Sequence, residues 1–163
     1  MRDLIAVLDR AYQNLRQAIF GLRALDPKRL GGLVPALAEY VGDWSEVRKI
    51  PIELRALSDE GLALAPEAEV QLIRIVHEAL TNSAKHAGAS RGVVTMERDG
   101  DALRVTIEDD GKGFAVDAVA DDGLHFGLET MRDRAEAVGG QLGIESAPGR
   151  GTRVVIHLPL ARA

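Results

Sequence analysis

Apolar residues recur every three or four positions across residues 70–89, VQLIRIVHEALTNSAKHAGA, and this period is typical of an α-helix. The pattern predicts one long helix with a broad apolar face that meets a core. That face comprises Leu72, Ile75, Val76, Ala79, Leu80 and Ser83. Pro66 suits the first turn, where its missing N–H costs nothing, and Gly88 suits a stop just past the end.

The other face of this predicted helix carries four polar side chains of different chemistry. Glu78, Asn82 and Lys85 lie on one stripe at i, i+4 and i+7, and His86 lies beside them. An acid, an amide, a cation and an imidazole therefore point to the same place. Taken alone, the stripe fits either a solvated surface or one wall of a binding site, and the rest of the chain has to decide.

Two further helices are expected ahead of this one. Residues 2–24 carry apolar side chains at nearly coiled-coil spacing, so this helix either packs on the domain behind it or pairs with a second copy. We favour pairing, as a coiled coil or a helical bundle in a homodimer. Asp26-Pro27 breaks the helix, and a second one is expected from Leu30 to Val47.

The remaining chain reads mainly as strands. Runs of β-type residues predict strands at 52–57, 93–98, 102–108, 141–146 and 152–158. A glycine at position 100 marks a hairpin turn between the second and third of these strands. Residues 115–126 are small, acidic and irregular, which predicts a mobile loop, and residues 127–138 predict a helix ended by Gly139-Gly140.

This order of elements predicts an α/β (α+β) two-layer sandwich, with a mixed, mostly antiparallel sheet covered by helices on one face. Residues 1–26 are expected to form the long N-terminal helix, and residues 27–163 the compact domain behind it.

Composition narrows the class of protein. The chain has 163 residues, of which 46% are hydrophobic and 28% charged, as in a globular domain with a real core. The formal net charge of -5 argues against nucleic-acid binding as the main activity. No apolar run approaches the ~20 residues needed to span a bilayer, and no signal peptide is seen. We therefore expect a cytoplasmic location, and leave open whether the parent protein is membrane-anchored.

The segment Asp109-Asp110-Gly111-Lys112-Gly113 follows a predicted strand. Two glycines one residue apart let a backbone approach a flat ligand without interference from Cβ atoms. The Asp109 carboxylate can accept a hydrogen bond from an exocyclic amino group, such as that of adenine. The alternative is a tight acidic turn in which the glycines serve backbone conformation alone.

Two more glycine segments lie further along the chain. Phe126-Gly127-Leu128 stands at an expected helix start, where free N–H groups and the positive end of the helix dipole suit phosphate. Gly149-Arg150-Gly151-Thr152 precedes the last strand and either forms a plain turn or brings the Thr152 hydroxyl near a ligand.

Together and in this order, these segments resemble the ATP-binding fold shared by DNA gyrase, the heat-shock chaperone, sensor histidine kinases and mismatch-repair ATPases. The resemblance covers about Ile52 to Leu160 and is greatest to sensor histidine kinases that partner LuxR-type response regulators. It rests on HEALTNSAKHAGAS, IEDDGKGF and HFGLETMRDRAEAVGGQLGIESAPGRGTRVVIHLP. RQAIFGLRAL, residues 16–25, is similar to the end of that subfamily's dimerisation and phosphotransfer hairpin.

The resemblance implies binding of ATP with Mg²⁺ and roles for individual residues. Asn82 supplies its side-chain oxygen to Mg²⁺. Glu78 is the catalytic base or orients the attacking group. Lys85 and His86 lie toward the phosphates, and Asp109 reads the adenine amino group.

The remaining implied roles concern the base pocket and the lid. Gly111 and Gly113 shape the base pocket, and Thr152 supports its base end. Gly127 and Leu128 hold phosphate at the end of the mobile loop, which acts as an ATP lid. The chemistry implied is phosphoryl transfer, in which positioning and charge neutralisation supply most of the catalysis.

One departure from the family pattern concerns the phosphoacceptor. The histidines of this chain are His77, His86, His125 and His157, and the N-terminal helices contain none of them. His77 lies within the nucleotide helix and is expected to be structural. We therefore expect a catalytic fragment that cannot phosphorylate itself in cis. The alternatives are a serine kinase that switches off a sigma factor, and a non-catalytic nucleotide-sensing or dimerisation module.

Overall fold

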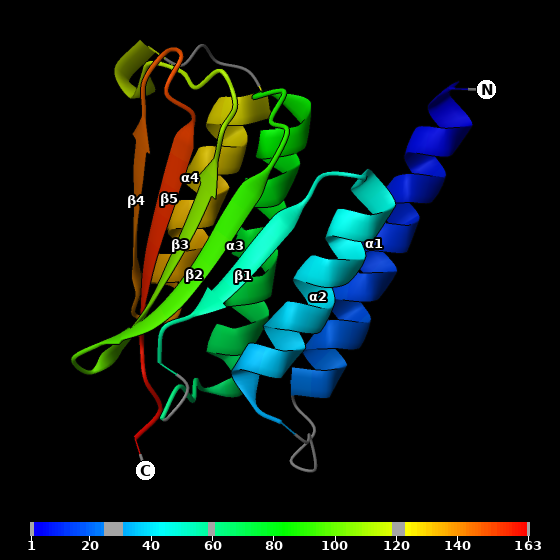
Figure 1. Ribbon diagram of the computed structural model, residues 1–163. Helices are drawn as coiled ribbons and strands as arrows, with labels where there is room; N and C mark the ends of the chain where they lie inside the picture. Colours follow the sequence, from blue (N-terminus) through cyan, green and yellow to red (C-terminus); the bar gives the residue numbers. More distant parts are fainter. Residues whose placement is uncertain (1, 25–30, 59–60, 119–122, 163) are drawn as a thin grey trace.

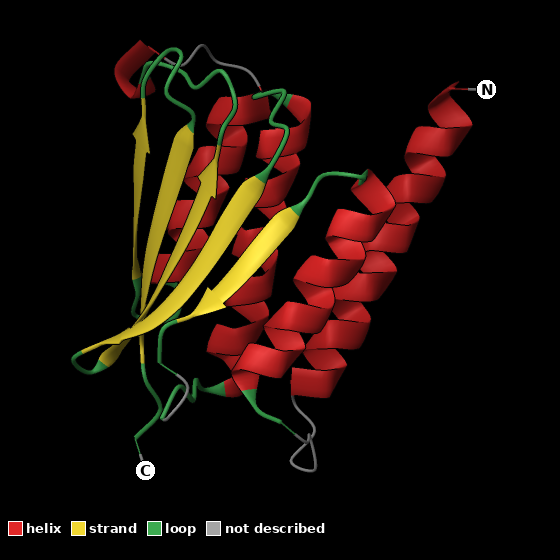
Figure 2. Cartoon of the chain, in the orientation of Figure 1, coloured by secondary structure: helices red, strands yellow, loops and turns green. Residues whose placement is uncertain are grey.

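The computed structural model describes residues 2–24, 31–58, 61–118 and 123–162. The elements are α1 (Arg2–Ala24), α2 (Leu33–Arg48), β1 (Ile52–Ala56), α3 (Pro66–Lys85), β2 (Gly92–Asp99), β3 (Ala102–Asp109), the short 3₁₀ turn η1 (Val116–Ala118), α4 (Gly123–Glu136), β4 (Gln141–Ser146) and β5 (Thr152–Pro159). Figure 2 shows the helices gathered behind and beside a twisted sheet.

The sheet has five strands in the order β1-β2-β3-β5-β4. β1 pairs with β2 in parallel, and every other neighbouring pair is antiparallel. The register places Asp109, the last residue of β3, opposite Thr152, the first residue of β5. The predicted mixed, mostly antiparallel sheet is thus confirmed. The glycine segments that follow Asp109 and precede Thr152 therefore lie at the same edge of the sheet.

The helices α3 and α4 cover one face of the sheet, and the core lies between these two layers (Figure 1). Strand residues at alternate positions, such as Val94, Met96, Val105 and Ile156, are fully buried against them. The α3 apolar face expected from the sequence is also buried, as the period of 3.6 requires. The predicted two-layer sandwich is confirmed.

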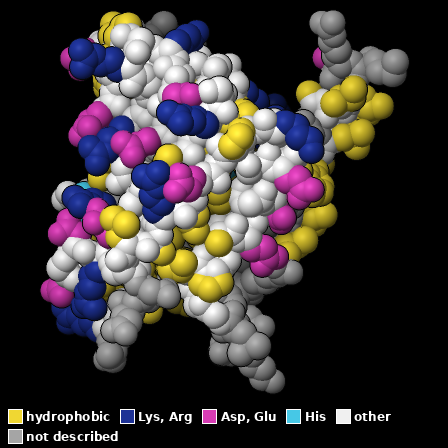
Figure 3. All heavy atoms as spheres, in the orientation of Figure 1, with side chains coloured by type: hydrophobic (Ala, Val, Ile, Leu, Met, Phe, Trp, Pro, Cys, Tyr) yellow, Lys and Arg dark blue, Asp and Glu magenta, His cyan; other side chains and the backbone are white. Residues whose placement is uncertain are grey.

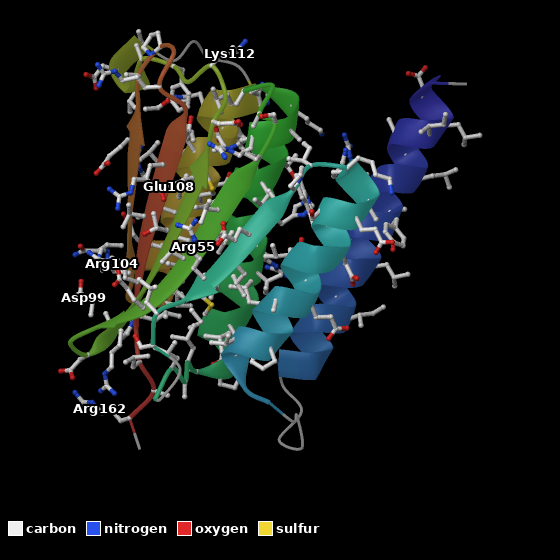
Figure 4. All side chains as sticks on the ribbon, viewed as in Figure 1. Arg55, Asp99, Arg104, Glu108, Lys112 and Arg162 are labelled. Atoms are coloured by element: carbon white, nitrogen blue, oxygen red, sulfur yellow. The ribbon has the colours of Figure 1, made fainter. Side chains whose placement is uncertain are left out.

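The uncovered face of the sheet carries a network of ion pairs (Figure 3). Arg153 lies between Glu108, at 3.5 Å, and Glu145, at 3.4 Å. Arg104 on β3 forms an ion pair with Glu97 on β2. Figure 4 shows that Arg104 and Glu108 project from this face, away from the helices. Because these charges are paired and solvated, this face is not a candidate for the ligand cavity.

Helix α1 contacts α3 and forms the outermost element on the right of Figure 1. Its outward surface bears an apolar stripe whose side chains are between 43% and 62% exposed: Leu4, Ile5, Leu8, Leu15 and Ile19. No helix among the described residues is both long and apolar enough to cross a bilayer.

Several predicted boundaries need correction. The helix expected over 70–89 runs from Pro66 to Lys85, because the chain leaves the helix at His86 and Gly88 takes a left-handed φ of 59°. The helix expected from Leu30 begins at Leu33. The break at Asp26-Pro27 and the position of Leu30 lie outside the described residues.

The largest correction concerns the loop expected over 115–126. Residues Val116–Ala118 form a 3₁₀ turn, and α4 begins at Gly123 instead of Gly127. The reason is that Leu124 extends the apolar stripe of Leu128, Met131 and Ala135 back by one turn, so the first turn also packs on the core. Residues 119–122 of the expected mobile loop lie outside the described residues.

Candidate functional site

A cavity of about 280 Å³ opens between α3, α4 and the ends of β3 and β5. Its walls combine apolar side chains with a small number of polar groups, as ligand pockets commonly do. The lining residues are Ala79, Asn82, Ser83, His86, Ala87, Ile107, Asp109, Lys112, Gly113, Phe114, Ala115, Ala118, Leu124, Leu128, Met131, Thr152 and Val154.

Most of the residues predicted for the site meet at this cavity. Asn82 and His86 line it from α3 and its end, Asp109 and Gly113 from the end of β3, and Thr152 from the start of β5. Leu128 also lines it, from α4. Glu78, Lys85, Gly111 and Gly127 are not part of its wall, although they adjoin residues that are.

The carboxylate of Asp109 is held from two sides. Its Oδ1 accepts a hydrogen bond from the Gly111 N–H at 2.9 Å, and its Oδ2 accepts one from the Ser83 hydroxyl at 2.7 Å. Both bonds fix the carboxylate at the cavity wall while leaving acceptor capacity toward the cavity. Sequence reasoning missed Ser83, because the helical period assigned it to the buried face.

The glycines after Asp109 permit close contact between backbone segments. A Cβ atom at Gly111 would overlap Ala87, and one at Gly113, whose φ is 61°, would overlap the carbonyl oxygen of Ala147. Any other residue would push the turn away from the loops beside it. The glycines thus bring Lys112 and Phe114 into the cavity wall, and sequence reasoning did not predict either of these residues.

Asp110, the neighbour of Asp109, faces away from the cavity. Its carboxylate accepts hydrogen bonds from the Ser90 hydroxyl and from the N–H groups of Ser90 and Arg91. These bonds, the Ser90 hydroxyl first among them, lower the pKa of Asp110 to about 2. Asp110 thereby ties the loop after α3 to the end of β3.

Thr152 is positioned by Ser146, which lies opposite it on β4. The Ser146 Oγ lies 3.0 Å from the Thr152 Oγ1, donates to the Gly151 carbonyl at 2.9 Å and accepts from the Phe114 N–H at 3.0 Å. One hydroxyl therefore joins β4, the turn before β5 and the segment after β3.

The other end of the site lies where α4 crosses α3. A Cβ atom at Gly127 would overlap the Glu78 carboxylate, and it would stand 3.5 Å from the Asn82 Nδ2. This Nδ2 is buried and has no hydrogen-bond partner among the described residues. A buried, unpaired amide normally needs a partner, so this amide suits a polar ligand in the cavity.

The prediction that a helix begins at Gly127 is wrong, since Gly127 lies inside α4. Its N–H therefore falls within the helix ladder and is not one of the free donors at a helix start. Leu128 is 5% exposed and contributes an apolar side chain to the cavity wall. The positive end of the helix dipole therefore does not lie at these two residues.

His77 lies on the side of α3 that faces α2. Its Nδ1 is 2.8 Å from the Tyr40 hydroxyl, and its Nε2 is 3.4 Å from the Thr81 hydroxyl. Burial, followed by the positive charges of Arg48, Lys85 and Arg134, lowers its pKa to about 4. Such contacts between helices agree with the structural role expected for His77.

Asn82 and Asp109 thus face one cavity, on a helix and a strand end of a sandwich with the expected topology. The family model described as histidine kinase-, DNA gyrase B- and HSP90-like ATPase matches residues 67–162. The chain belongs to this ATPase family. The match begins at the first turn of α3 and ends after β5, so it contains all the lining residues of the cavity.

Named relatives extend the similarity toward the N-terminus, ahead of that range. The signal transduction histidine-protein kinase/phosphatase DegS of Brevibacillus brevis is 34% identical over 160 residues, covering 98% of this chain and 40% of that protein. The nitrate/nitrite sensor protein NarX of Escherichia coli K12 is 30% identical over 151 residues, covering 91% of this chain and 24% of that protein. The chain therefore spans less than half of these relatives.

Solved structures of a histidine kinase share the fold of this chain. The blue-light activated histidine kinase EL346 of Erythrobacter litoralis superposes with a TM-score of 0.71 at 25% identity, over 95% of this chain and 50% of that one. The histidine kinase domain from that kinase gives a TM-score of 0.62 at 28% identity, over 79% of this chain and 61% of that one.

Proposed function

We propose that this chain is the ATP-binding, catalytic portion of a sensor histidine kinase, and that it donates the γ-phosphoryl group of Mg-ATP to a histidine on a helical hairpin. The observation that carries the proposal is the meeting of Asn82 and Asp109 at one cavity. An acceptor-only carboxylate suits the purine amino group, and a buried amide without a partner suits the phosphate and metal end. The names of the relatives support the kinase activity.

The residues at the metal end fit a hydrated Mg²⁺. The described residues hold no cluster of three or more acidic, histidine or cysteine side chains that could bind a metal by themselves. Mg²⁺ in phosphoryl-transfer sites is commonly held by one or two protein oxygens together with substrate phosphates and water. The Asn82 amide would supply the protein oxygen, and Glu78, one turn earlier on α3, would serve as base or orient the attacking group. Lys85 and His86 would lie toward the phosphates.

The proposed protein partners are inferred from the exposed apolar stripe on α1 and from the positions of the histidines. The apolar stripe on α1 would pair with a second copy and with the other helix of the hairpin, in a bundle. None of the four histidines lies in α1 or α2, so the acceptor would be a histidine outside these helices. The phosphoryl group would pass on to a response regulator, which we expect to be of the LuxR type. The helices ahead of β1 speak against the sigma-factor kinase, which would begin near its first strand.

A calorimetric titration with ATP, with and without Mg²⁺, tests this proposal. We expect ATP binding that Mg²⁺ strengthens. Asn82→Leu, which keeps the size of the side chain but offers no oxygen, should remove most of the Mg²⁺ effect while leaving the affinity for adenosine nearly unchanged, because the change lies at the phosphate end of the cavity. A wild-type chain that does not bind ATP under either condition refutes the proposal, and so does a Mg²⁺ effect that Asn82→Leu leaves intact.

A further inference from the structure

A serine of α3 holds the Asp109 carboxylate in place. Ser83 is 5% exposed, lines the cavity, and places its Oγ 2.7 Å from the Asp109 Oδ2. The same Oγ lies 3.0 Å from the Ala79 carbonyl, one turn back on the helix. A hydroxyl has one proton to donate, and both the shorter distance and the negative charge favour the carboxylate as its acceptor.

The second oxygen of this carboxylate is fixed as well. Asp109 Oδ1 accepts from the Gly111 N–H at 2.9 Å, so both oxygens are bonded by donors of the protein. The plane of the carboxylate is therefore set by α3 on one side and by its own turn on the other. Toward the cavity, this carboxylate presents hydrogen-bond acceptors and no donor.

We propose that Ser83 is a positioning residue that sets the selectivity of the cavity between purine nucleotides, favouring an amino group over a carbonyl group at C6 of the ring. This inference rests on the proposed function. A 6-amino group donates to the fixed carboxylate, whereas a 6-carbonyl oxygen faces another acceptor and is repelled. Without Ser83, the carboxylate keeps only the bond to the Gly111 N–H, so Oδ2 can turn away from the ring, and both the bond to an amino group and the repulsion of a carbonyl are weakened.

The chain offers a matched control one residue further along. Asp110 accepts a hydrogen bond from the Ser90 hydroxyl, so two consecutive aspartates each have a serine partner. Ser90 and Asp110 are not in the wall of the cavity as the described residues form it. Removing the Ser90 hydroxyl therefore changes the same kind of pair without touching the nucleotide site.

The experiment is calorimetric titration of the full chain with ATP and with inosine triphosphate, which carries a carbonyl at C6. Wild type, Ser83→Ala, Ser83→Thr and Ser90→Ala are compared. We expect Ser83→Ala to lower the ratio of ATP affinity to inosine triphosphate affinity by about tenfold, the effect of one hydrogen bond to a charged group. Ser83→Thr, which keeps the hydroxyl, should restore the ratio, and Ser90→Ala should leave it at the wild-type value.

If the ratio of ATP affinity to inosine triphosphate affinity is the same in Ser83→Ala as in wild type, the inference is overturned. An equal loss of selectivity in Ser83→Ala and Ser83→Thr assigns the effect to packing and overturns it too, as does the same loss in Ser90→Ala. A wild-type chain that binds neither nucleotide refutes the proposed function and this inference with it. A wild-type chain that binds ATP, with selectivity unaffected by Ser83→Ala, refutes the inference alone.

Discussion

The Asp109 carboxylate lies where β3 ends, with a donor from α3 on one side and a donor from its own turn on the other. The Asn82 amide lies one helical turn above Glu78 and has no protein partner for its nitrogen among the described residues. The two side chains therefore differ in how much of their hydrogen bonding the protein satisfies. The Asp109 carboxylate is held in place by the protein itself, whereas the Asn82 Nδ2 can donate to a bound ligand.

Replacing Asp109 by Asn should weaken ATP binding by about 1–3 kcal/mol, because a charged acceptor at the purine edge is lost. Isothermal titration calorimetry measures this change directly. Asp110→Asn is the control, since Asp110 bonds the loop after α3 and does not line the cavity. Equal losses in both variants would assign the effect to loop stability and contradict the assignment of Asp109 to the base.

His77 should make stability depend on pH. Its pKa is about 4 in the folded chain and near 6.5 in the unfolded chain, so the unfolded state binds the proton more tightly between these values. Its contribution to stability is present above pH 6.5 and is lost as pH falls from 6.5 toward 4, by about 2–3 kcal/mol in total. Urea unfolding at pH 7 and pH 4.5 measures the loss. His77→Gln should reduce it, and an identical loss in the variant would contradict the prediction.

At the scale of elements, α4 lies against the Glu78 side chain of α3 at Gly127. A methyl group there would meet the end of the Glu78 side chain, which is flexible enough to move aside. Gly127→Ala should therefore leave folding stability within about 1 kcal/mol, because alanine also favours the helix. It should lower phosphoryl transfer to a supplied hairpin substrate by about tenfold to a hundredfold, because the displaced carboxylate is the proposed base.

Gly42 provides the comparison for this substitution. It lies inside α2, and a Cβ atom there would meet nothing within 4 Å. Gly42→Ala should raise stability by about 0.5–1 kcal/mol and leave transfer unchanged. Thermal unfolding and a radioactive transfer assay distinguish the two variants. Full transfer activity in Gly127→Ala would remove Glu78 from the proposed role.

At the scale of the whole molecule, the exposed stripe of α1 predicts association. Its leucines and isoleucines keep up to 62% of their surface in water, which is costly for so regular a row of apolar side chains. We expect the chain to sediment as a dimer in analytical ultracentrifugation, and Leu8→Glu with Leu15→Glu to make it a monomer. Arg10→Glu, also on α1, is the control. A monomeric wild type at high concentration would contradict the dimer.

The sequence predicted the sheet and α3, because helical and strand periods record which face is buried. The meeting of Asn82 with Asp109 was implied by the resemblance of the motifs to the ATP-binding fold and not by any local period. It did not predict Ser83, since the partner of this hydroxyl is 26 residues away and the helical period assigns Ser83 to the core. It placed the start of α4 at Gly127, because a glycine resembles a cap, whereas packing of Leu124 extends the helix. A long-range contact, which no local pattern records, accounts for the first error. The second error is local, because the apolar period already continues back through the glycine to Leu124.

The position of β5 between β3 and β4 has a consequence for how the protein is made. β5 follows α3, β3 and β4 in the order of the described elements, yet Thr152 and Val154 form part of the cavity wall, and Ser146 on β4 anchors that wall. On the ribosome, a nascent chain that already contains α3 and β3 still has one side of the cavity open to water. The pocket is completed only when the β4–β5 hairpin docks, so the nascent chain gains a closed nucleotide cavity only after this hairpin has left the ribosome.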